Sequence, residues 1–179
     1  MANYIRTYSG VRFVPTEPEK EKIQIEDIAH ALPMLCRGNG HVKTFWSVGE
    51  HCICCAKEAL ARGLGARLAL ACLLHDASEA YLADVTRPVK AELPRYKEIE
   101  GPLQDLIWNK WLSAPLTSAE NTQVFEIDDH MLAHEFIHIM DTKIVEPTPE
   151  LLSNGEFSFT GFDTCRQEFL QLFRQLLGA

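Results

Sequence analysis

The chain has 179 residues, of which 46% are hydrophobic, and this is enough for one domain with a substantial core. A formal net charge of -8 and a pI near 5.3 exclude a broad basic surface of the kind that binds duplex nucleic acid. The N-terminal segment has no apolar signal core, and no apolar run reaches the roughly 18 residues of a membrane span, so we expect no membrane association and a cytoplasmic location.

Residues 1–24 are expected to form an extended N-terminal arm. Their first half carries β-branched and aromatic side chains up to Pro15, and a charged run typical of solvent-exposed chain follows. Helical periodicity begins at Ile25 and continues to Leu35. Two glycines then favour a loop over residues 37–45.

Two helices are predicted in the middle of the chain. Ser47 and Glu50 have the spacing of a capping box, which predicts a helix that runs from there to about Gly63. Residues 66–81 predict a second helix that is almost entirely apolar before His75, and therefore central to the core. Pro88 disfavours helical geometry in the residue before it, which predicts a loop over residues 82–90.

Three further helices are predicted at residues 95–112, 118–141 and 163–177, with Ser118 as the cap of the second and a loop over 145–162. The first of them carries Trp108 and Trp111, which are candidates for a contact in a homodimer or higher homo-oligomer. The predicted fold class is all-α: a bundle of about six helices in one domain, residues 25–179, preceded by the arm.

Chemistry-bearing residues gather where the apolar helix ends. His75 and Asp76 are adjacent, and Glu79 lies on the same helical face as both, which is ligand spacing. In the alternative interpretation, His75 satisfies a hydrogen bond in the core while the two carboxylates face water.

Two other segments supply matching residues. His51 lies on the preceding helix, and Asp128 lies on the apolar side of the long helix, where an unpaired carboxylate would be unfavourable. Two imidazoles and two carboxylates form a site for a divalent transition metal with positions open to water and substrate. Three cysteines beside His51 suggest zinc, but no second cysteine pair follows at zinc-site spacing, so the thiols are predicted to be small core hydrophobes.

The order of these residues resembles the H…HD…D signature of the HD-domain metal-dependent phosphohydrolases, an all-helical family. Residues 75–90, HDASEAYLADVTRPVK, are similar to the branch that contains bacterial 5'-deoxynucleotidases and phage enzymes that hydrolyse dATP. The similarity runs from about Ile25 to Glu135. It implies a divalent metal ion (Mn, Co, Mg, Zn or Fe) with four ligands: His51, His75, Asp76 and Asp128.

The resemblance also implies roles for residues near the metal. Glu79 would handle the proton of the attacking water, and Asp84 would help to orient that water or the leaving oxygen. Arg37 is the first candidate to bind the substrate phosphate, because its planar fork suits phosphate oxygens. Arg87 and Lys90 could also approach a phosphate; otherwise they balance an acidic surface.

Other residues are weaker candidates. His41, Phe45 and Trp46 could contact the nucleotide, with a place in the core as the alternative for Trp46. His30 could support the site from behind, and Glu135 could brace it or pair with Arg37. His130, His134 and His138 form a stripe on the long helix, which we interpret as a partner interface or a solvated face.

The sequence therefore predicts an enzyme that hydrolyses a small nucleotide, with a deoxynucleoside 5'-monophosphate as the leading substrate. A triphosphohydrolase of the dATP type is the alternative, and it would need further cations such as Lys43, Arg87 and Lys90. A binding module that keeps metal or nucleotide without turnover is a second class, and a pure interaction protein is a third.

Overall fold

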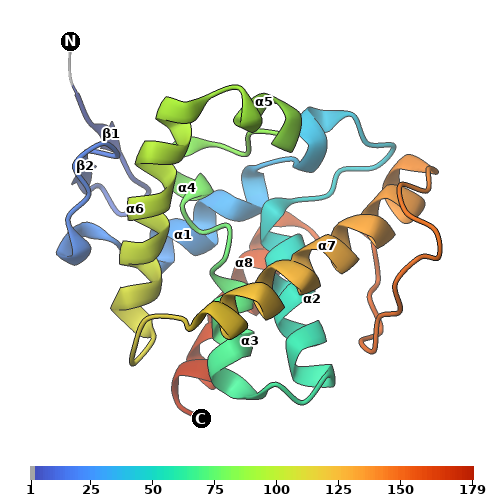
Figure 1. The fold of residues 1–179 in the computed structure, drawn as a ribbon. Helices are drawn as coiled ribbons and strands as arrows, with labels where there is room; N and C mark the ends of the chain where they lie inside the picture. The colour runs from blue at the N-terminus through green and yellow to red at the C-terminus, as the bar shows by residue number, and fades with distance from the viewer. Residues whose placement is uncertain (1–2) are drawn as a thin grey trace.

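The computed structural model describes residues 3–179 and is mainly helical, as the sequence predicts (Figure 1). Its α-helices are α1 Ile25–Ala31, α2 Val48–Ala61, α3 Gly65–Leu73, α4 Glu79–Leu82, α5 Arg87–Ala91, α6 Pro94–Trp111, α7 Ser118–Met140 and α8 Phe162–Leu177. Two short strands, β1 Ile5–Arg6 and β2 Arg12–Phe13, pair antiparallel in a hairpin. No helix within residues 3–179 combines the length and the apolar character that a membrane span needs.

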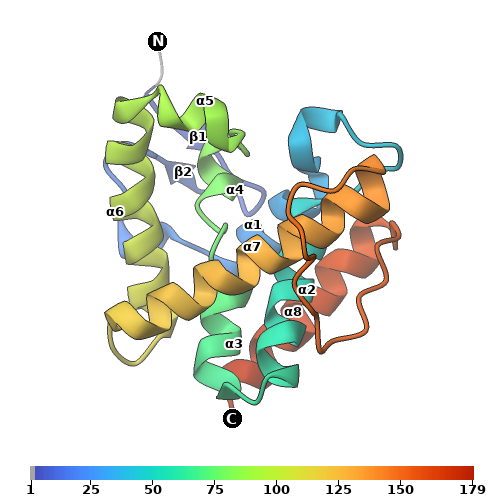
Figure 2. The same ribbon diagram turned by 45° about the vertical axis from the view of Figure 1, so that its right-hand side comes forward.

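The core lies where α2, α3, α7 and α8 meet. α2 packs against the other three, and α7 crosses α2 and α3 diagonally (Figures 1 and 2). Every residue of α3 from Leu68 to Leu73 is buried, so the predicted central position of this apolar segment is confirmed. Of these four helices, α2 and α7 carry side chains of the candidate site, and the end of α3 leads into the turn that carries the others.

The N-terminal arm is tied to the helices by its hairpin. Phe13 is fully buried and its ring stacks on Tyr81, with the ring centroids 4.2 Å apart. The turn of the hairpin is fixed by Asp27, whose carboxylate accepts hydrogen bonds from the backbone N–H and the hydroxyl of Ser9. The arm therefore covers one end of the helical core.

The predicted helix over 66–81 is interrupted. α3 ends at Leu73, residues 74–78 form turns, and α4 begins at Glu79. Gln104 of α6 stabilises the interruption, because its amide donates to the Leu74 carbonyl at 2.7 Å and accepts from the Ser78 N–H at 3.1 Å. The sequence-based prediction missed this break because the polar partner lies on a distant helix.

Two smaller predictions are also corrected. Residues 87–91 form a short helix, α5, instead of a loop; Pro88 lies in its first turn, where the missing N–H has no helical partner to lose. The cap of α7 is Thr117, in a capping box with Glu120, and not Ser118. The capping box of Ser47 and Glu50 at the start of α2 is confirmed.

Glu58, a buried residue of α2, anchors the segment between α7 and α8. Its carboxylate accepts hydrogen bonds from the backbone N–H groups of Leu152 and Ser153, from the Ser153 hydroxyl at 2.7 Å and from Arg62 Nε at 2.8 Å. Burial raises the pKa of Glu58, but the hydrogen bonds from Arg62, Ser153 and Leu152 lower it more, and the net shift is downward.

We expect Glu58→Ala to lower the free energy of unfolding by about 2–4 kcal/mol, because several partly buried donors lose the charged acceptor that the buried Glu58 supplies. Urea denaturation at neutral pH measures this loss. Glu168→Ala is the matched control: Glu168 pairs with Lys57 at the surface, and its removal is expected to cost less than about 1 kcal/mol. A lowered pKa stabilises fully above the unfolded-state value, and this stabilisation is lost as the pH falls through the folded-state value. The Glu58 contribution should therefore decline progressively below about pH 4.3. Equal effects of the two variants would contradict the anchoring role.

Candidate metal centre and cavity

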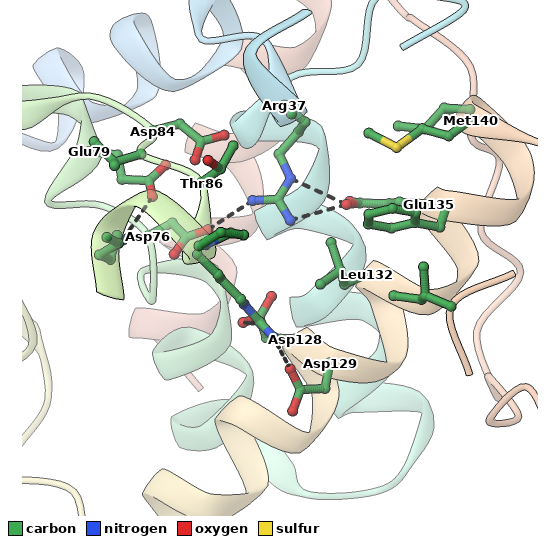
Figure 3. A pocket seen from close by; sticks show the side chains of 18 of the residues that line it. Arg37, Asp76, Glu79, Asp84, Thr86, Asp128, Asp129, Leu132, Glu135 and Met140 are labelled. Carbon is green, nitrogen blue, oxygen red and sulfur yellow. Dashed lines mark hydrogen bonds and ion pairs between the residues drawn. The ribbon is translucent and has the colours of Figure 1, made fainter. Parts of the chain in front are cut away.

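Four side chains converge from α2, from the turn after α3 and from α7. His51 Nε2 lies 3.2 Å from His75 Nε2 and 3.1 Å from Asp128 Oδ1. Asp76 Oδ2 lies 3.3 Å from His75 Nε2 and 3.8 Å from His51 Nε2. The structure thus brings together the four residues that the sequence proposes as metal ligands, and both carboxylates border the cavity drawn in Figure 3.

The hydrogen bonds of the two histidines fix which nitrogen faces the centre. His75 Nδ1 lies 2.7 Å from the Cys72 carbonyl, and His51 Nδ1 lies 2.6 Å from Glu135 Oε1; each of these oxygens can only accept. Both Nδ1 atoms therefore carry the proton, and a neutral ring then presents a lone pair at Nε2. Two nitrogen lone pairs and two carboxylates are aimed at one place, which is an arrangement that a cation stabilises.

A divalent metal ion fits this donor set. Ligand atoms about 2.1 Å from a metal lie roughly 3.0–3.4 Å apart in octahedral or tetrahedral geometry. The observed separations of 3.1–3.8 Å reach this range or exceed it slightly. In addition, the donor atoms of His51, Cys55 and His75, and those of Cys52, His75 and Asp76, lie within 4.8 Å of one another. The buried cluster can hold a metal ion.

The titration of the cluster follows the same electrostatics. Burial lowers the pKa of His75, but Asp76 and a hydrogen bond to Asp128 raise it more, so the pKa lies well above the usual value. Burial raises the pKa of Asp128, yet hydrogen bonds from His51 and His75 bring it well below the usual value. Positive charge is favoured at this place, whether a proton or a metal ion supplies it.

Glu135 of α7 accepts hydrogen bonds from three neighbouring side chains. Its carboxylate accepts from His51 Nδ1, from Trp46 Nε1 at 2.8 Å, and from Nε and Nη2 of Arg37 at 3.2 and 3.1 Å. Burial raises the pKa of Glu135, but Arg37 and His51 lower it, to about 2. The predicted pairing of Glu135 with Arg37 is confirmed. Arg37 also reaches Asp76 Oδ2, at 3.4 Å, so it lies beside the histidine–aspartate cluster (Figure 3).

A cavity of about 620 Å³ opens over this cluster. One side is charged and includes Glu79 and Asp84 (Figure 3). Burial, together with Asp76 and Asp84, raises the pKa of Glu79 well above its usual value. Burial also raises the pKa of Asp84; Arg37 opposes this shift and Asp76 adds to it. Glu79, next to the cluster, is therefore more readily protonated than an exposed glutamate.

The opposite side of the cavity is apolar. Its residues come mainly from one face of α7 and from the chain just after it: Phe125, Leu132, Phe136, Ile139, Met140 and Ile144. This wall was not predicted from the sequence. The signal was present, because these positions recur at three- to four-residue and seven-residue steps on a face other than that of Val124, Ile127 and Met131.

The two remaining basic candidates lie at the cavity on α5. Arg87 Nη2 lies 2.7 Å from Asp128 Oδ2, and Arg87 also pairs with Asp129. Lys90 Nζ lies 2.6 Å from Glu100 Oε1 and 3.8 Å from Glu79 Oε1. Both cations are tied to carboxylates that line the same cavity, so they balance its negative charge.

The remaining candidates, His41, Phe45 and Trp46 for the nucleotide and His30 behind the site, do not line the cavity. Trp46 is 1% exposed and its indole N–H is used by Glu135, so no ring face is left for a base. His41 is exposed and does not line the cavity, because the turn at Gly38 and Asn39 directs the following chain away. Phe45 packs edge-on against Phe159. His30 stacks on Tyr8 of the arm, with the ring centroids 3.7 Å apart.

The histidine stripe of α7 packs against the chain itself. His134 Nε2 lies 2.8 Å from the Pro149 carbonyl, and the His138 ring stacks on Phe157 at 4.6 Å. His130 Nδ1 lies 2.8 Å from an Arg62 nitrogen. His138 is nevertheless exposed, and His130 and His134 are half-buried, so the stripe is partly solvated, as predicted, and partly covered by the segment before α8. The partner interface stays a prediction.

The tryptophans of α6 are also used within the chain. Trp108 is 7% exposed and donates from its indole N–H to the Ala71 carbonyl. Trp111 packs edge-on against Phe173 of α8. Neither residue forms the exposed apolar surface that the sequence analysis offered for a dimer, and the dimer itself stays a prediction.

Fold and site define a helical protein with a buried histidine–aspartate cluster at the base of a cavity. No family model matches the chain. The uncharacterized protein YfdR of Escherichia coli (strain K12) is 36% identical over 133 residues, which cover 74% of this chain and 70% of YfdR. The uncharacterized protein RCAP_rcc00048 of Rhodobacter capsulatus is 41% identical over 104 residues, 55% of this chain and 53% of that protein. The chain belongs to the same family as YfdR, and it spans about half the length of the second relative.

Proposed function

We propose that this protein is a metal-dependent phosphohydrolase of the HD-domain type that hydrolyses a deoxynucleoside 5'-monophosphate. The observation that carries the proposal is the convergence of His51, His75, Asp76 and Asp128 beside a cavity that is also lined by the largely buried Arg37. A cavity of about 620 Å³ is within the usual range for sites that enclose a small molecule.

Each residue of the site has its own role in the proposed reaction. A divalent ion, when bound to the four ligands, makes water nucleophilic at neutral pH and takes up charge that develops on the phosphoryl oxygens. Arg37 presents its guanidinium to the same oxygens and is held in place by Glu135. Glu79, whose raised pKa suits a proton carrier, takes or returns the proton of the water. Asp84 accepts a hydrogen bond from the water or the leaving group.

The other end of the nucleotide would lie against the apolar wall of α7. A nucleobase presents two flat apolar faces, and Phe125, Leu132 and Phe136 line the cavity opposite the carboxylates. The base therefore contacts this wall in our proposal, instead of the His41 and Trp46 that the sequence suggested.

The charge of the cavity favours a monophosphate over a triphosphate. Seven carboxylates line the cavity: Asp76, Glu79, Asp84, Glu100, Asp128, Asp129 and Glu135. Only Arg37, Arg87 and Lys90 oppose them, and each is already paired with one of these carboxylates. One divalent ion leaves the cavity negative, which opposes two additional phosphates. The triphosphohydrolase alternative would require Arg87 and Lys90 to leave their partners.

The proposal is tested by incubating the protein with deoxy- and ribonucleoside mono- and triphosphates, with Mn²⁺, Co²⁺ or Mg²⁺, and with a chelator. We expect metal-dependent release of inorganic phosphate and nucleoside from deoxynucleoside monophosphates. Tripolyphosphate from a deoxynucleoside triphosphate would establish the alternative reaction. A folded, metal-loaded protein that turns over none of these nucleotides would contradict the proposal and favour a binding module.

A further inference from the structure

Three buried thiols surround the two histidines of the cluster, and the proposed hydrolysis uses none of them. Cys52 and Cys55 lie on α2, and Cys72 lies on α3; all three are at most 1% exposed and none forms a disulfide. Cys55 is one helical turn beyond His51, so the two side chains share a helix face. The Cys55 Sγ lies 3.6 Å from His51 Nε2.

We propose that His51, Cys55 and His75 form a second, thiol-bearing metal position that takes thiophilic divalent cations such as Zn²⁺ and Cd²⁺. This inference rests on the proposed role of His51 and His75 as metal ligands. It adds a soft donor to a set that otherwise contains only imidazole and carboxylate groups, and soft thiolate donors select zinc over magnesium or manganese.

The separations of the donor atoms suit such an ion. Tetrahedral zinc with nitrogen ligands at about 2.05 Å and sulfur at about 2.3 Å has nitrogen–nitrogen and nitrogen–sulfur separations of roughly 3.3 and 3.6 Å. The two Nε2 atoms are 3.2 Å apart, and the Cys55 sulfur is 3.6 Å from the nearer of them. All three donor atoms lie within 4.8 Å of one another. Asp128 Oδ1, 3.1 Å from His51 Nε2, is available as the fourth donor.

The two positions differ in their access to the cavity. Asp76 and Asp128 line the cavity, whereas Cys55 does not. The two carboxylates therefore face the substrate, whereas the Cys55 thiol faces the helical core. Because both sets use the same two Nε2 atoms, one ion excludes the other. An ion bound by two histidines, Cys55 and Asp128 is four-coordinate and closed, which is the form of a structural zinc site without a free position for substrate.

Binding at this position is a simple exchange. The Sγ–H bond of Cys55 breaks, its proton leaves to solvent, and a sulfur–metal bond forms, with no change of oxidation state. Because an ion at this position uses the two Nε2 atoms that the hydrolytic ion needs, Zn²⁺ and Cd²⁺ should compete with Mn²⁺ and inhibit turnover.

Titration of the metal-free protein with Cd²⁺ tests the proposal. We expect the ultraviolet absorption band of sulfur-to-cadmium charge transfer in the wild-type protein and its loss in Cys55→Ser, together with at least about a tenfold weaker Cd²⁺ affinity. Cys54→Ser is the matched control, because Cys54 is the neighbouring residue of α2 and belongs to neither group of donor atoms. This control should keep both the band and the affinity.

A second measurement keeps the test independent of any variant. Cadmium NMR of the wild-type protein should give the downfield shift of a sulfur-bound ion; a shift typical of nitrogen and oxygen ligands alone would overturn the proposal. So would a charge-transfer band that persists in Cys55→Ser or in Cys55→Ala. Mn²⁺ binding is measured in parallel by paramagnetic resonance. A protein that binds Mn²⁺ but shows no cadmium–sulfur bond disproves only the thiol position, whereas a protein that binds neither ion disproves the proposed function as well.

Discussion

Asp76→Ala is expected to lower nucleotide hydrolysis at least about a thousand-fold, the loss that follows when several kcal/mol of metal-based stabilisation disappear. Asp76 supplies a carboxylate 3.3 Å from His75 Nε2 and also accepts from Arg37. The variant therefore loses a metal ligand and one of the contacts that place the arginine. Initial rates with Mn²⁺, and the metal content of the purified protein, measure the two effects separately.

The control for this variant is Asp105→Ala, in which an exposed carboxylate of α6 outside the main cavity is removed. It should leave the rate within about a factor of two, because surface substitutions have small effects. Undiminished turnover of Asp76→Ala would exclude the proposed metal centre.

Bound metal stabilises the folded state, so Mn²⁺ at a hundred times its dissociation constant should raise the unfolding free energy of the wild-type protein by about 2.7 kcal/mol.

Glu135→Ala is expected to produce the largest loss of stability. Glu135 is 2% exposed and accepts from His51, Trp46 and Arg37. Removing it leaves a buried guanidinium and two buried N–H donors without their acceptor, which costs about 3–5 kcal/mol. For a chain of this size, the midpoint of thermal unfolding should fall by roughly 10 °C. Scanning calorimetry at neutral pH measures it.

Two comparisons make this prediction specific. Glu126→Ala removes a half-exposed carboxylate of the same helix, paired with Arg62, and should change stability by less than about 0.5 kcal/mol. Glu135→Gln keeps the volume and an acceptor oxygen, so its loss should be smaller than that of Glu135→Ala. If Glu126→Ala and Glu135→Ala destabilise equally, the buried network does not contribute as we describe.

The same network predicts a pH dependence. The pKa of Glu135 is lowered to about 2 in the folded chain, against about 4.3 in an unfolded chain. A lowered pKa stabilises the folded state above the unfolded value, and this stabilisation disappears as the pH falls from about 4.3 to about 2. The wild-type protein should therefore lose stability more steeply than Glu135→Gln over this interval.

The sequence by itself determined the features that depend on neighbouring residues. The capping box of Ser47 and Glu50 is local, and the apolar run before His75 has only one stable place, the core. The spacing of His75 and Asp76, with His51 and Asp128 in order around them, was enough to propose which residues meet. The sequence could predict this meeting because buried charges without partners are unfavourable, so charged residues on apolar helix faces must find one another.

Only the tertiary structure decided the features that depend on distant partners. Gln104 ends α3 from thirty residues away, and Glu135 turns Trp46 into a buried donor that cannot stack on a base. The apolar wall of the cavity belongs to a face of α7 that looks like ordinary core in one dimension. His51 and Cys55 share a face of α2, but only the packing of α2 against α3 brings His75 to them. Helical periodicity shows which side chains share a face, but what that face meets depends on the packing of the other helices, and the packing fixes hydrogen-bond partners that the sequence does not specify.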